Sequence, residues 1–368
     1  MAKRVVISNS DIRMFKRCRR RWEYLSKLRK GLKIKRIDTK LSLGVGIHVA
    51  LSAYYSHYNK GEHSLEVLLS SFAGWYTKEK ARLEELEVFE EQKSEMFELY
   101  EFGKEILTGY ASWAAKYDSK DFTKVLYNEE RIDIPIRNPN GKRTCGTYSF
   151  KADLIVEDKD GFLWLTDHKT IATANIPSLE LDEQAVSYLY GAQKKLKIKI
   201  EGVIFNFLIK KLPSVPESLK NGELSKKKIA TTYDVYLDAI KKHYNFEEKE
   251  EKEKIEILLP YKEILEELQN QENPFFKREK VYKSQSEIEE IGRRLYYEYK
   301  EMRNPKINIF PNPTRDCSWD CGLRTLCIVE NDDGDVKSLI DDIFESKEKG
   351  KKETSFVIVS EDSPEEEV

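Results

Sequence analysis

Apolar residues recur at helical spacing in the first third of the chain. Ser8 to Leu25 is predicted to form one helix, because Ser8–Asp11 resembles a capping box and apolar residues then repeat every three or four positions, with Cys18 on the same face. A second helix is predicted from about Leu43 to Tyr58. Residues 64–117 continue as charged, aromatic-rich helical sequence, which we interpret as a helical insertion at about 60–120.

From Lys124 the pattern changes to strands. Three strand-like runs, joined by Asn-Pro-Asn-Gly and Asp-Lys-Asp-Gly turns, predict an antiparallel meander. A helix at about Leu181 to Lys195 and an apolar strand at Gly202 to Ile209 follow, which predicts a mixed sheet with helices packed against it. Residues 245–302 are expected to be a second helical insertion.

Composition narrows the class of protein. The 368 residues include 40% hydrophobic ones, enough for a sizeable core. No window approaches 18 consecutive apolar residues, and the N-terminus has no apolar stretch of signal-peptide length, so a cytoplasmic protein without a membrane segment is expected. Residues 1–40 hold fifteen Lys or Arg against three acids, a charge pattern that would attract a polyanion but is also common on solvated surfaces.

The turn between two of the predicted strands places two carboxylates opposite each other. If the loop is Lys159-Asp160-Gly161, position 158 pairs with 162, 156 with 164 and 154 with 166, so Asp153 lies across from Asp167 on one face. Like charges at that separation are destabilising, which favours a cation between them, and two carboxylates suit Mg²⁺ or Mn²⁺.

Lys169 lies two residues beyond Asp167 and therefore returns to the same face. A divalent metal there would polarise a scissile phosphate and activate water, while the ammonium group would stabilise developing negative charge. An Asp-x-Lys triplet is common on the surface of so charged a chain. Here, however, the hairpin has apolar residues on both faces, so the charges lie at the end of a buried element, where they need partners.

The order of several separated motifs resembles the RecB-like branch of the PD-(D/E)XK nucleases, which includes iron–sulfur exonucleases of bacterial recombination, phages and CRISPR adaptation. The opening Ser8 to Cys18 is similar to the first helix of that family, Gly44 to His48 to its G-x-x-x-H motif, Asp167-His168-Lys169 to its (D/E)-x-K motif, and Gln184 to Tyr188 to its Q-x-x-x-Y motif. Asp153 looks like its metal Asp, although Phe150 stands where the family has Gly.

The resemblance implies a restriction-endonuclease-like α/β fold, with a central mixed sheet flanked by helices. It implies a metal held by His48, Asp153, Asp167 and the carbonyl of His168, with Gln184 and Tyr188 positioning DNA or the Lys. Each has an ordinary structural alternative: His48 could be a hydrogen-bonded core histidine, and the Gln184–Tyr188 pair could cap the sheet. Glu129 or Glu130 could supply another carboxylate.

Four of the five cysteines form a one-plus-three pattern. Cys317, Cys321 and Cys327 lie close in sequence, and Cys18 lies nearly three hundred residues earlier. Four thiolates suit a 4Fe-4S cluster or a structural zinc ion, and the same distribution appears in the iron–sulfur branch, usually with one residue fewer between the first two of the three. Cys145 is expected to be a small buried residue.

The sequence therefore predicts a nuclease domain over 1–330, with the cysteine cluster at 317–327, and an acidic tail over 331–368 without fixed structure. The expected activity is that of a DNA exonuclease acting on single-stranded ends, in recombination, replication or phage DNA processing. A weakly active DNA-binding or assembly subunit and a structure-specific endonuclease are the alternatives. No G-x-x-x-x-G-K-(S/T) loop is present, so any helicase or recombination partner would be another protein.

Overall fold

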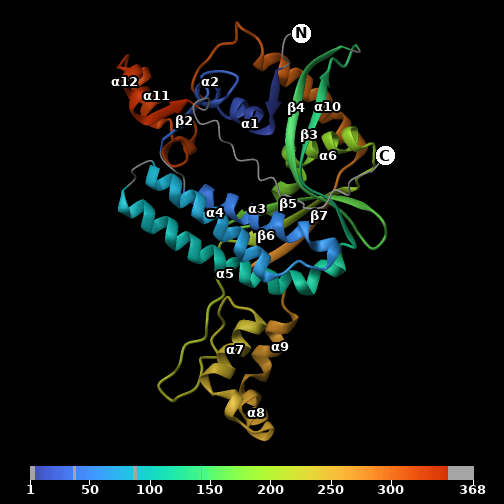
Figure 1. The fold of residues 1–368 in the computed structure, drawn as a ribbon, viewed down its shortest axis with the longest axis vertical. Helices are drawn as coiled ribbons and strands as arrows, with labels where there is room; N and C mark the ends of the chain where they lie inside the picture. The colour runs from blue at the N-terminus through green and yellow to red at the C-terminus, as the bar shows by residue number, and fades with distance from the viewer. Residues whose placement is uncertain (1–4, 36–38, 86–88, 142, 347–368) are drawn as a thin grey trace, which may run out of the picture. The chain divides into compact units, whose positions relative to one another are not determined.

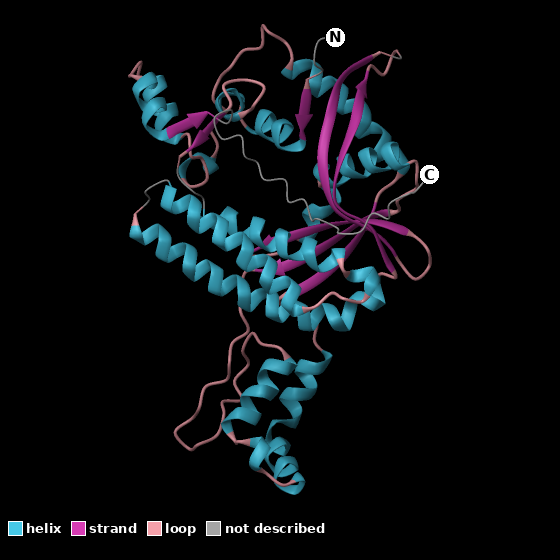
Figure 2. Ribbon diagram, in the orientation of Figure 1, coloured by secondary structure: helices cyan, strands magenta, loops and turns pink. Residues whose placement is uncertain are grey.

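The computed structural model describes residues 5–35, 39–85, 89–141 and 143–346 (Figures 1 and 2). The chain divides into two compact units, and neither is continuous in sequence. The first unit comprises residues 1–9 and 37–300, and the second comprises residues 10–36 and 301–368.

The first unit is built on a six-stranded mixed sheet. The strand order is β1-β4-β5-β6-β7, with β3 paired to β4; β1 with β4 and β5 with β6 are parallel, and the other pairs are antiparallel. A mixed sheet flanked by helices confirms the predicted fold class. The strands are β1 (Val6–Ser8), β3 (Lys124–Arg137), β4 (Thr144–Glu157), β5 (Leu163–Ile171), β6 (Gly202–Ile209) and β7 (Phe276–Tyr282).

The hairpin of β4 and β5 has the predicted register. Leu154 pairs with Thr166 and Val156 with Trp164, and the amide of Asp158 donates to the carbonyl of Phe162 at 2.9 Å. Gly161 supplies the left-handed turn conformation, with φ +78°. β4 is longer than its partner: its last residues pair with β5, and its residues 147–149 pair with β1. The site described below lies where β4 leaves β5.

Helices α3 (Thr39–Ser56), α4 (Leu65–Glu85) and α5 (Glu90–Asp121) pack together and against the sheet (Figure 1). They share one apolar core with the strands, in which Leu51, Phe72 and Leu107 meet Trp164 and Ile204. Each fully buried side chain of this size stabilises the fold by about 1.5–3 kcal/mol. The helices α4 and α5 occupy the first predicted insertion.

Helix α6 (Glu183–Leu196) connects β5 to β6 and contacts both of these strands as well as β3 and β4. Asp182 caps its N-terminus by accepting a hydrogen bond from the amide of Ala185 at 3.1 Å. Its position was predicted to within about two residues. Because α6 begins close to the end of the β4–β5 hairpin in sequence, its first turn can reach the same site.

The second predicted insertion differs from the expected long helix. A small helical module between β6 and β7 has its own core of Leu224, Tyr236, Ile240 and Tyr261, among others. The expectation of helix throughout 245–302 is wrong at β7, an edge strand paired to β6. The remaining helices of this unit are α7 (Tyr233–His243), α8 (Glu251–Leu258), α9 (Lys262–Asn270), α10 (Gln285–Met302) and the 3-10 helices η1 (Tyr58–Lys60), η2 (Ile176–Leu181), η3 (Phe246–Glu248) and η4 (Leu259–Tyr261).

The second unit joins an early and a late segment of the chain. Tyr24, Leu323, Leu326 and Phe344 form its core, and β2 pairs antiparallel with β8. Its elements are α1 (Asn9–Arg17), α2 (Arg19–Leu25), β2 (Leu32–Ile34), η5 (Arg315–Ser318), α11 (Arg324–Asn331), α12 (Val336–Ile343) and β8 (Phe344–Ser346).

Two predictions for this unit are corrected. The single helix expected over Ser8–Leu25 is interrupted at Cys18, whose extended backbone (φ −163°, ψ 118°) separates α1 from α2. The segment after residue 330 was expected to lack fixed structure, but α12 and β8 follow there, because the apolar residues of α12 pack on the core of the unit. The rest of the predicted tail, 347–368, lies outside the described residues.

Candidate functional site

Asp153 is held at the end of the β4–β5 hairpin by contacts to two other elements. Its Oδ2 accepts a hydrogen bond from the backbone N–H of His168 at 2.8 Å. Its Oδ1 lies 3.5 Å from Nδ1 of His48, on α3. The two predicted residues His48 and Asp153 are therefore brought together, although about one hundred residues separate them in sequence.

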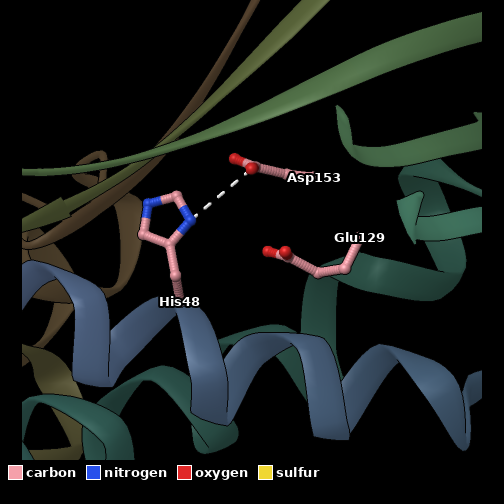
Figure 3. Close-up of side chains that lie close together, drawn as sticks. All are labelled: His48, Glu129 and Asp153. Carbon is pink, nitrogen blue, oxygen red and sulfur yellow. Dashed lines mark ion pairs between the residues drawn. The ribbon is translucent and has the colours of Figure 1, made fainter. Parts of the chain in front are cut away.

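Glu129 completes a group of three possible metal ligands. One donor atom from each of His48, Glu129 and Asp153 lies within 4.8 Å of the others, and Figure 3 shows the three side chains turned toward a common space. On β3, Asn128 pairs with Leu154 and Glu130 with Ala152, so Glu129 lies opposite Asp153. Oxygen donors with one imidazole suit a divalent cation.

From the sequence, Glu129 was predicted only as one of two adjacent carboxylates that could contribute to the site. Its backbone has a φ of +53°, in the left-handed region that costs a non-glycine residue about 1–2 kcal/mol. Glu130 is exposed, whereas the Glu129 side chain is 17% exposed and paired with Lys151. Counting back from the Asn-Pro-Asn-Gly turn does not place Glu129 beside Asp153, because the pairing of β3 with β4 shifts register between Ile136 and Arg137. The backbone conformation leaves no signal in the sequence.

The group carries unbalanced negative charge. Burial would lower the pKa of His48, but Asp153 and Glu129 raise it to about 9. Burial would raise the pKa of Asp153, but His48 and the His168 amide hold it below its usual value. Burial and the charge of Asp153 raise the pKa of Glu129. In the metal-free protein, a proton on His48 therefore supplies the positive charge that the carboxylates favour.

Buried Asp167 and partly exposed Lys169 form an ion pair beside this group. Nζ of Lys169 lies 2.6 Å from Oδ2 of Asp167, as expected from strand alternation. Burial raises the pKa of Asp167 to about 6, while Lys169 lowers it. Burial would lower the pKa of Lys169, but Asp167 and Asp182 raise it. Lys169 therefore stays protonated at neutral pH and can donate hydrogen bonds to an anion but not accept a proton.

Comparison with known protein families decides the class of this site. The family model described as "PD-(D/E)XK nuclease superfamily" matches residues 6–328 of the chain. The chain belongs to this superfamily. No curated protein matches the chain at a significant level. Membership means that the protein is a nuclease that hydrolyses phosphodiester bonds of nucleic acid with a divalent metal.

The donors of this PD-(D/E)XK nuclease fit such a metal. His48, Glu129 and Asp153 offer one imidazole and two carboxylates within 4.8 Å. Asp167, predicted as a ligand, is not part of that group and pairs with Lys169 instead. It still interacts electrostatically with Asp153, whose negative charge raises the pKa of Asp167. The carbonyl of His168 stays a predicted ligand.

The side chain of His168 faces the interior of the nuclease. Its ring is 3% exposed, stacks on Tyr55 at 5.6 Å between centroids and lies edge-on to His48 at 5.9 Å. Its Nδ1 lies 2.8 Å from Nδ2 of Asn206, on β6. Burial lowers the pKa of His168 to about 3, so this ring is neutral.

Gln184 and Tyr188 meet on α6, as their spacing predicted. Nε2 of Gln184 donates to the Tyr188 hydroxyl at 3.0 Å. Tyr188 stacks on Phe150 with ring centroids 4.5 Å apart. Phe150, which stands where the family has glycine, is accommodated by Gly191, where an added Cβ would lie 2.1 Å from the Phe150 ring. Phe150 therefore packs between the Tyr188 ring and Gly191 of α6.

The second unit brings together the four cysteines of the one-plus-three pattern. Cys18, Cys317, Cys321 and Cys327 line one cavity of about 240 Å³. The break between α1 and α2 places Cys18 there. Cys145, expected to be buried, is partly exposed at the start of β4 in the first unit, where its Sγ lies 3.8 Å from the carbonyl of Arg143.

The cavity supplies hydrogen-bond donors to sulfur. The amides of Asn312 and Thr314 donate to Sγ of Cys18 and of Cys317, each at 3.4 Å, and Nη1 of Arg20 donates to Sγ of Cys327 at 3.2 Å. Arg17, Arg21 and Arg324 also line the cavity. Positive charge and N–H donors stabilise thiolates, which are the form that binds metals.

Among the described residues, no helix has the length and apolarity needed to cross a bilayer.

Proposed function

We propose that this nuclease is a DNA exonuclease that acts on single-stranded ends. The observation that carries the proposal is the juxtaposition of the His48–Glu129–Asp153 group with the Asp167–Lys169 pair within a PD-(D/E)XK fold. The choice of DNA, of single strands and of ends is supported by the motif resemblance to the RecB-like iron–sulfur exonucleases. The same resemblance supports a role in recombination, replication or phage DNA processing, alongside a separate helicase or recombination partner. A cytoplasmic location, expected from the sequence, is part of the proposal.

The metal, Mg²⁺ or Mn²⁺, would be held by His48, Glu129 and Asp153, with Asp167 and the His168 carbonyl as further ligands. When bound, it would polarise the scissile phosphate and lower the pKa of the attacking water. Asp153 is the fixed point of this set, because the His168 amide orients its second oxygen.

Lys169 would stabilise negative charge on the phosphate. Its pKa is raised and its side chain is about one-quarter exposed, so it can reach a ligand while staying protonated. Gln184 and Tyr188 would position the DNA or the ammonium group of Lys169. Because Tyr188 stacks on Phe150 and bonds to Gln184, its ring is held in one orientation.

We propose a 4Fe-4S cluster in the cysteine cavity, with zinc as the alternative. Four thiols line the cavity, and three of them accept hydrogen bonds from N–H groups, as cluster ligands do. Tetrahedral zinc, bound at about 2.3 Å from each sulfur, suits the same four thiolates and is therefore the alternative.

Degradation of labelled DNA tests the activity. Linear single-stranded, linear double-stranded and circular single-stranded DNA are incubated with Mg²⁺ or Mn²⁺ and with wild type, Asp153→Ala or Lys169→Ala. Asp160→Ala and Lys159→Ala are matched controls, since both residues are exposed in the turn of the same hairpin.

An exonuclease releases mononucleotides or short products from linear single strands and leaves circles intact. We expect both site variants to lose activity by at least about 100-fold and both turn variants to keep it. Cleavage of circles would replace the exonuclease with an endonuclease. A wild type that binds DNA but cuts none of the substrates would point to a binding or assembly subunit.

A further inference from the structure

A row of buried polar side chains crosses the sheet behind the proposed metal site. His168 on β5 pairs in register with Asn206 on β6, and Asn206 pairs with Arg278 on β7. The three are neighbours on adjacent strands. Asn206 is fully buried, His168 is 3% exposed and the side chain of Arg278 is 6% exposed. Buried polar groups of this kind must satisfy one another's hydrogen bonds.

Arg278 is the fixed end of the row. Its guanidinium forms an ion pair with Asp118, donates to Asp121 at 2.7 Å and to the Tyr55 hydroxyl at 3.0 Å, and packs on the Phe122 ring. Arg has N–H donors and no acceptor. Its Nε lies 3.2 Å from the side-chain oxygen of Asn206, and that contact is therefore a bond from Arg278 to Asn206.

This direction determines the other bonds of Asn206. With its oxygen turned to Arg278, its Nδ2 donates to the Tyr110 hydroxyl at 2.9 Å and faces Nδ1 of His168 at 2.8 Å. Nδ2 is also a donor, so Nδ1 of His168 must accept and cannot carry a proton. The imidazole of His168 therefore carries its proton on Nε2.

The Nε2 proton points away from β6. The two ring nitrogens of histidine are directed to different sides of the ring, and β5 lies between β6 and β4. The side away from β6 is that of Asp153 on β4, and the His48 ring lies 5.9 Å from that of His168. Among the residues that the structure describes, Nε2 is buried and has no hydrogen-bond partner. A buried N–H without a partner costs about 1–3 kcal/mol, and an acceptor on a bound ligand would relieve that cost.

We propose that Arg278 and Asn206 are positioning residues that fix His168 as its Nε2–H tautomer, and that this N–H donates to an anionic oxygen bound beside His48 and Asp153. The anionic oxygen belongs to the phosphate backbone of the nucleic acid, and this part of the proposal rests on the proposed function. Through Asn206, Arg278 on β7 thus determines which ring nitrogen of His168 carries the donor proton.

The tautomer is measurable without metal or DNA. The chain has five histidines, so ¹⁵N-histidine labelling of the full chain gives few ring signals, and His168→Gln identifies those of His168. We expect wild type to show a protonated Nε2 and an unprotonated Nδ1 at pH 7. A proton on Nδ1, alone or together with one on Nε2, overturns the proposal.

Asn206→Asp reverses the direction of the bond. A carboxylate only accepts, so it still pairs with Arg278 but requires a proton on Nδ1 of His168. We expect the proton to move to Nδ1 and the KM for a short single-stranded DNA to rise roughly ten-fold, as for other orienting partners of a site, with thermal unfolding still cooperative. Asn59→Asp is the control, because the side chain of Asn59 also uses both its nitrogen and its oxygen in hydrogen bonds, here to the backbone of Val125.

The possible failures are distinct. If the proton stays on Nε2 in Asn206→Asp, or moves in Asn59→Asp, the row does not set the tautomer and the proposal is wrong. If the proton moves but KM is unchanged, the donor does not serve the phosphate. If the wild type cuts no DNA, the proposed function fails, while a Nε2–H tautomer would still establish the role of the row.

Discussion

Replacing Glu129 by Gln tests the metal group that the structure assembles. The substitution keeps the size of the side chain and removes one of two carboxylates within 4.8 Å of the His48 ring nitrogen. Unit charges 4 Å apart interact by about 4 kcal/mol at an effective dielectric constant of 20. Lys151, which pairs with Glu129, cancels part of this attraction. We therefore expect a net loss of about 1.4–2.8 kcal/mol, or a 10- to 100-fold weaker Kd for Mn²⁺.

The assay is a titration of the metal-free protein with Mn²⁺, in which the electron paramagnetic resonance signal of the free ion measures how much Mn²⁺ is unbound. Glu130→Gln is the matched control, since Glu130 is the next residue of β3 and is exposed. If Glu129→Gln binds Mn²⁺ within two-fold of wild type while Asp153→Ala does not bind, Glu129 is not a ligand and the metal lies nearer Asp167.

A second substitution at the same position separates metal binding from backbone strain. Glu129→Gly relieves the left-handed conformation, so we expect it to raise the free energy of unfolding of the metal-free protein by about 1 kcal/mol while weakening Mn²⁺ binding. Chemical denaturation of wild type, Glu129→Gln and Glu129→Gly measures this. Loss of stability in the glycine variant would show that the carboxylate, and not the strain, dominates at this position.

Three further predictions concern other parts of the chain. The pKa of His48 in the folded protein, about 9, is above the roughly 6.5 of unfolded histidine. In EDTA, the stabilisation that protonated His48 provides is therefore complete below pH 6.5 and is lost toward pH 9. Between these pH values, the free energy of urea unfolding should fall by roughly 1–2 kcal/mol more in wild type than in His48→Gln, and equal losses would contradict this. Anaerobically purified wild type should absorb broadly near about 400 nm and contain iron, Cys317→Ser should lose both and Cys145→Ser neither, whereas stoichiometric zinc without iron would exclude the cluster. Gly191→Ala, with its Cβ 2.1 Å from an aromatic carbon, should destabilise by about 1–3 kcal/mol, whereas Gly74→Ala, with no atom within 4 Å, should stabilise by up to about 1 kcal/mol in thermal unfolding.

Local patterns predicted the β4–β5 hairpin well. The register of β4 and β5 depended only on a three-residue turn with a glycine at its end, so Asp153 and Asp167 could be placed from sequence. Apolar β6 was equally clear, because a run from Gly202 to Ile209 buried on both faces has few alternatives. These features are set by neighbours in the chain.

Features that depend on distant partners could not be predicted. β7 reads as charged sequence, and its buried Arg278 is compatible with a strand only because Asp118 and Asp121 of α5 neutralise it. Glu129 differs from Glu130 through a backbone conformation that sequence does not record. Helix α12 looked like part of a polar tail, because the core on which it packs is completed by residues such as Tyr24 and Leu32, about three hundred positions earlier.

The pairing of β2 with β8 has a consequence for biosynthesis. Residues 10–36 leave the ribosome long before residue 301, where the second segment of the same unit begins. At about 5–20 residues per second, this delay is on the order of tens of seconds. During that time Cys18 has none of its three partner cysteines, and Tyr24 lacks the apolar residues that bury it. The early segment therefore cannot complete its core or the cysteine cavity while the sheet of the first unit is being synthesised, and both wait for residues 317–346.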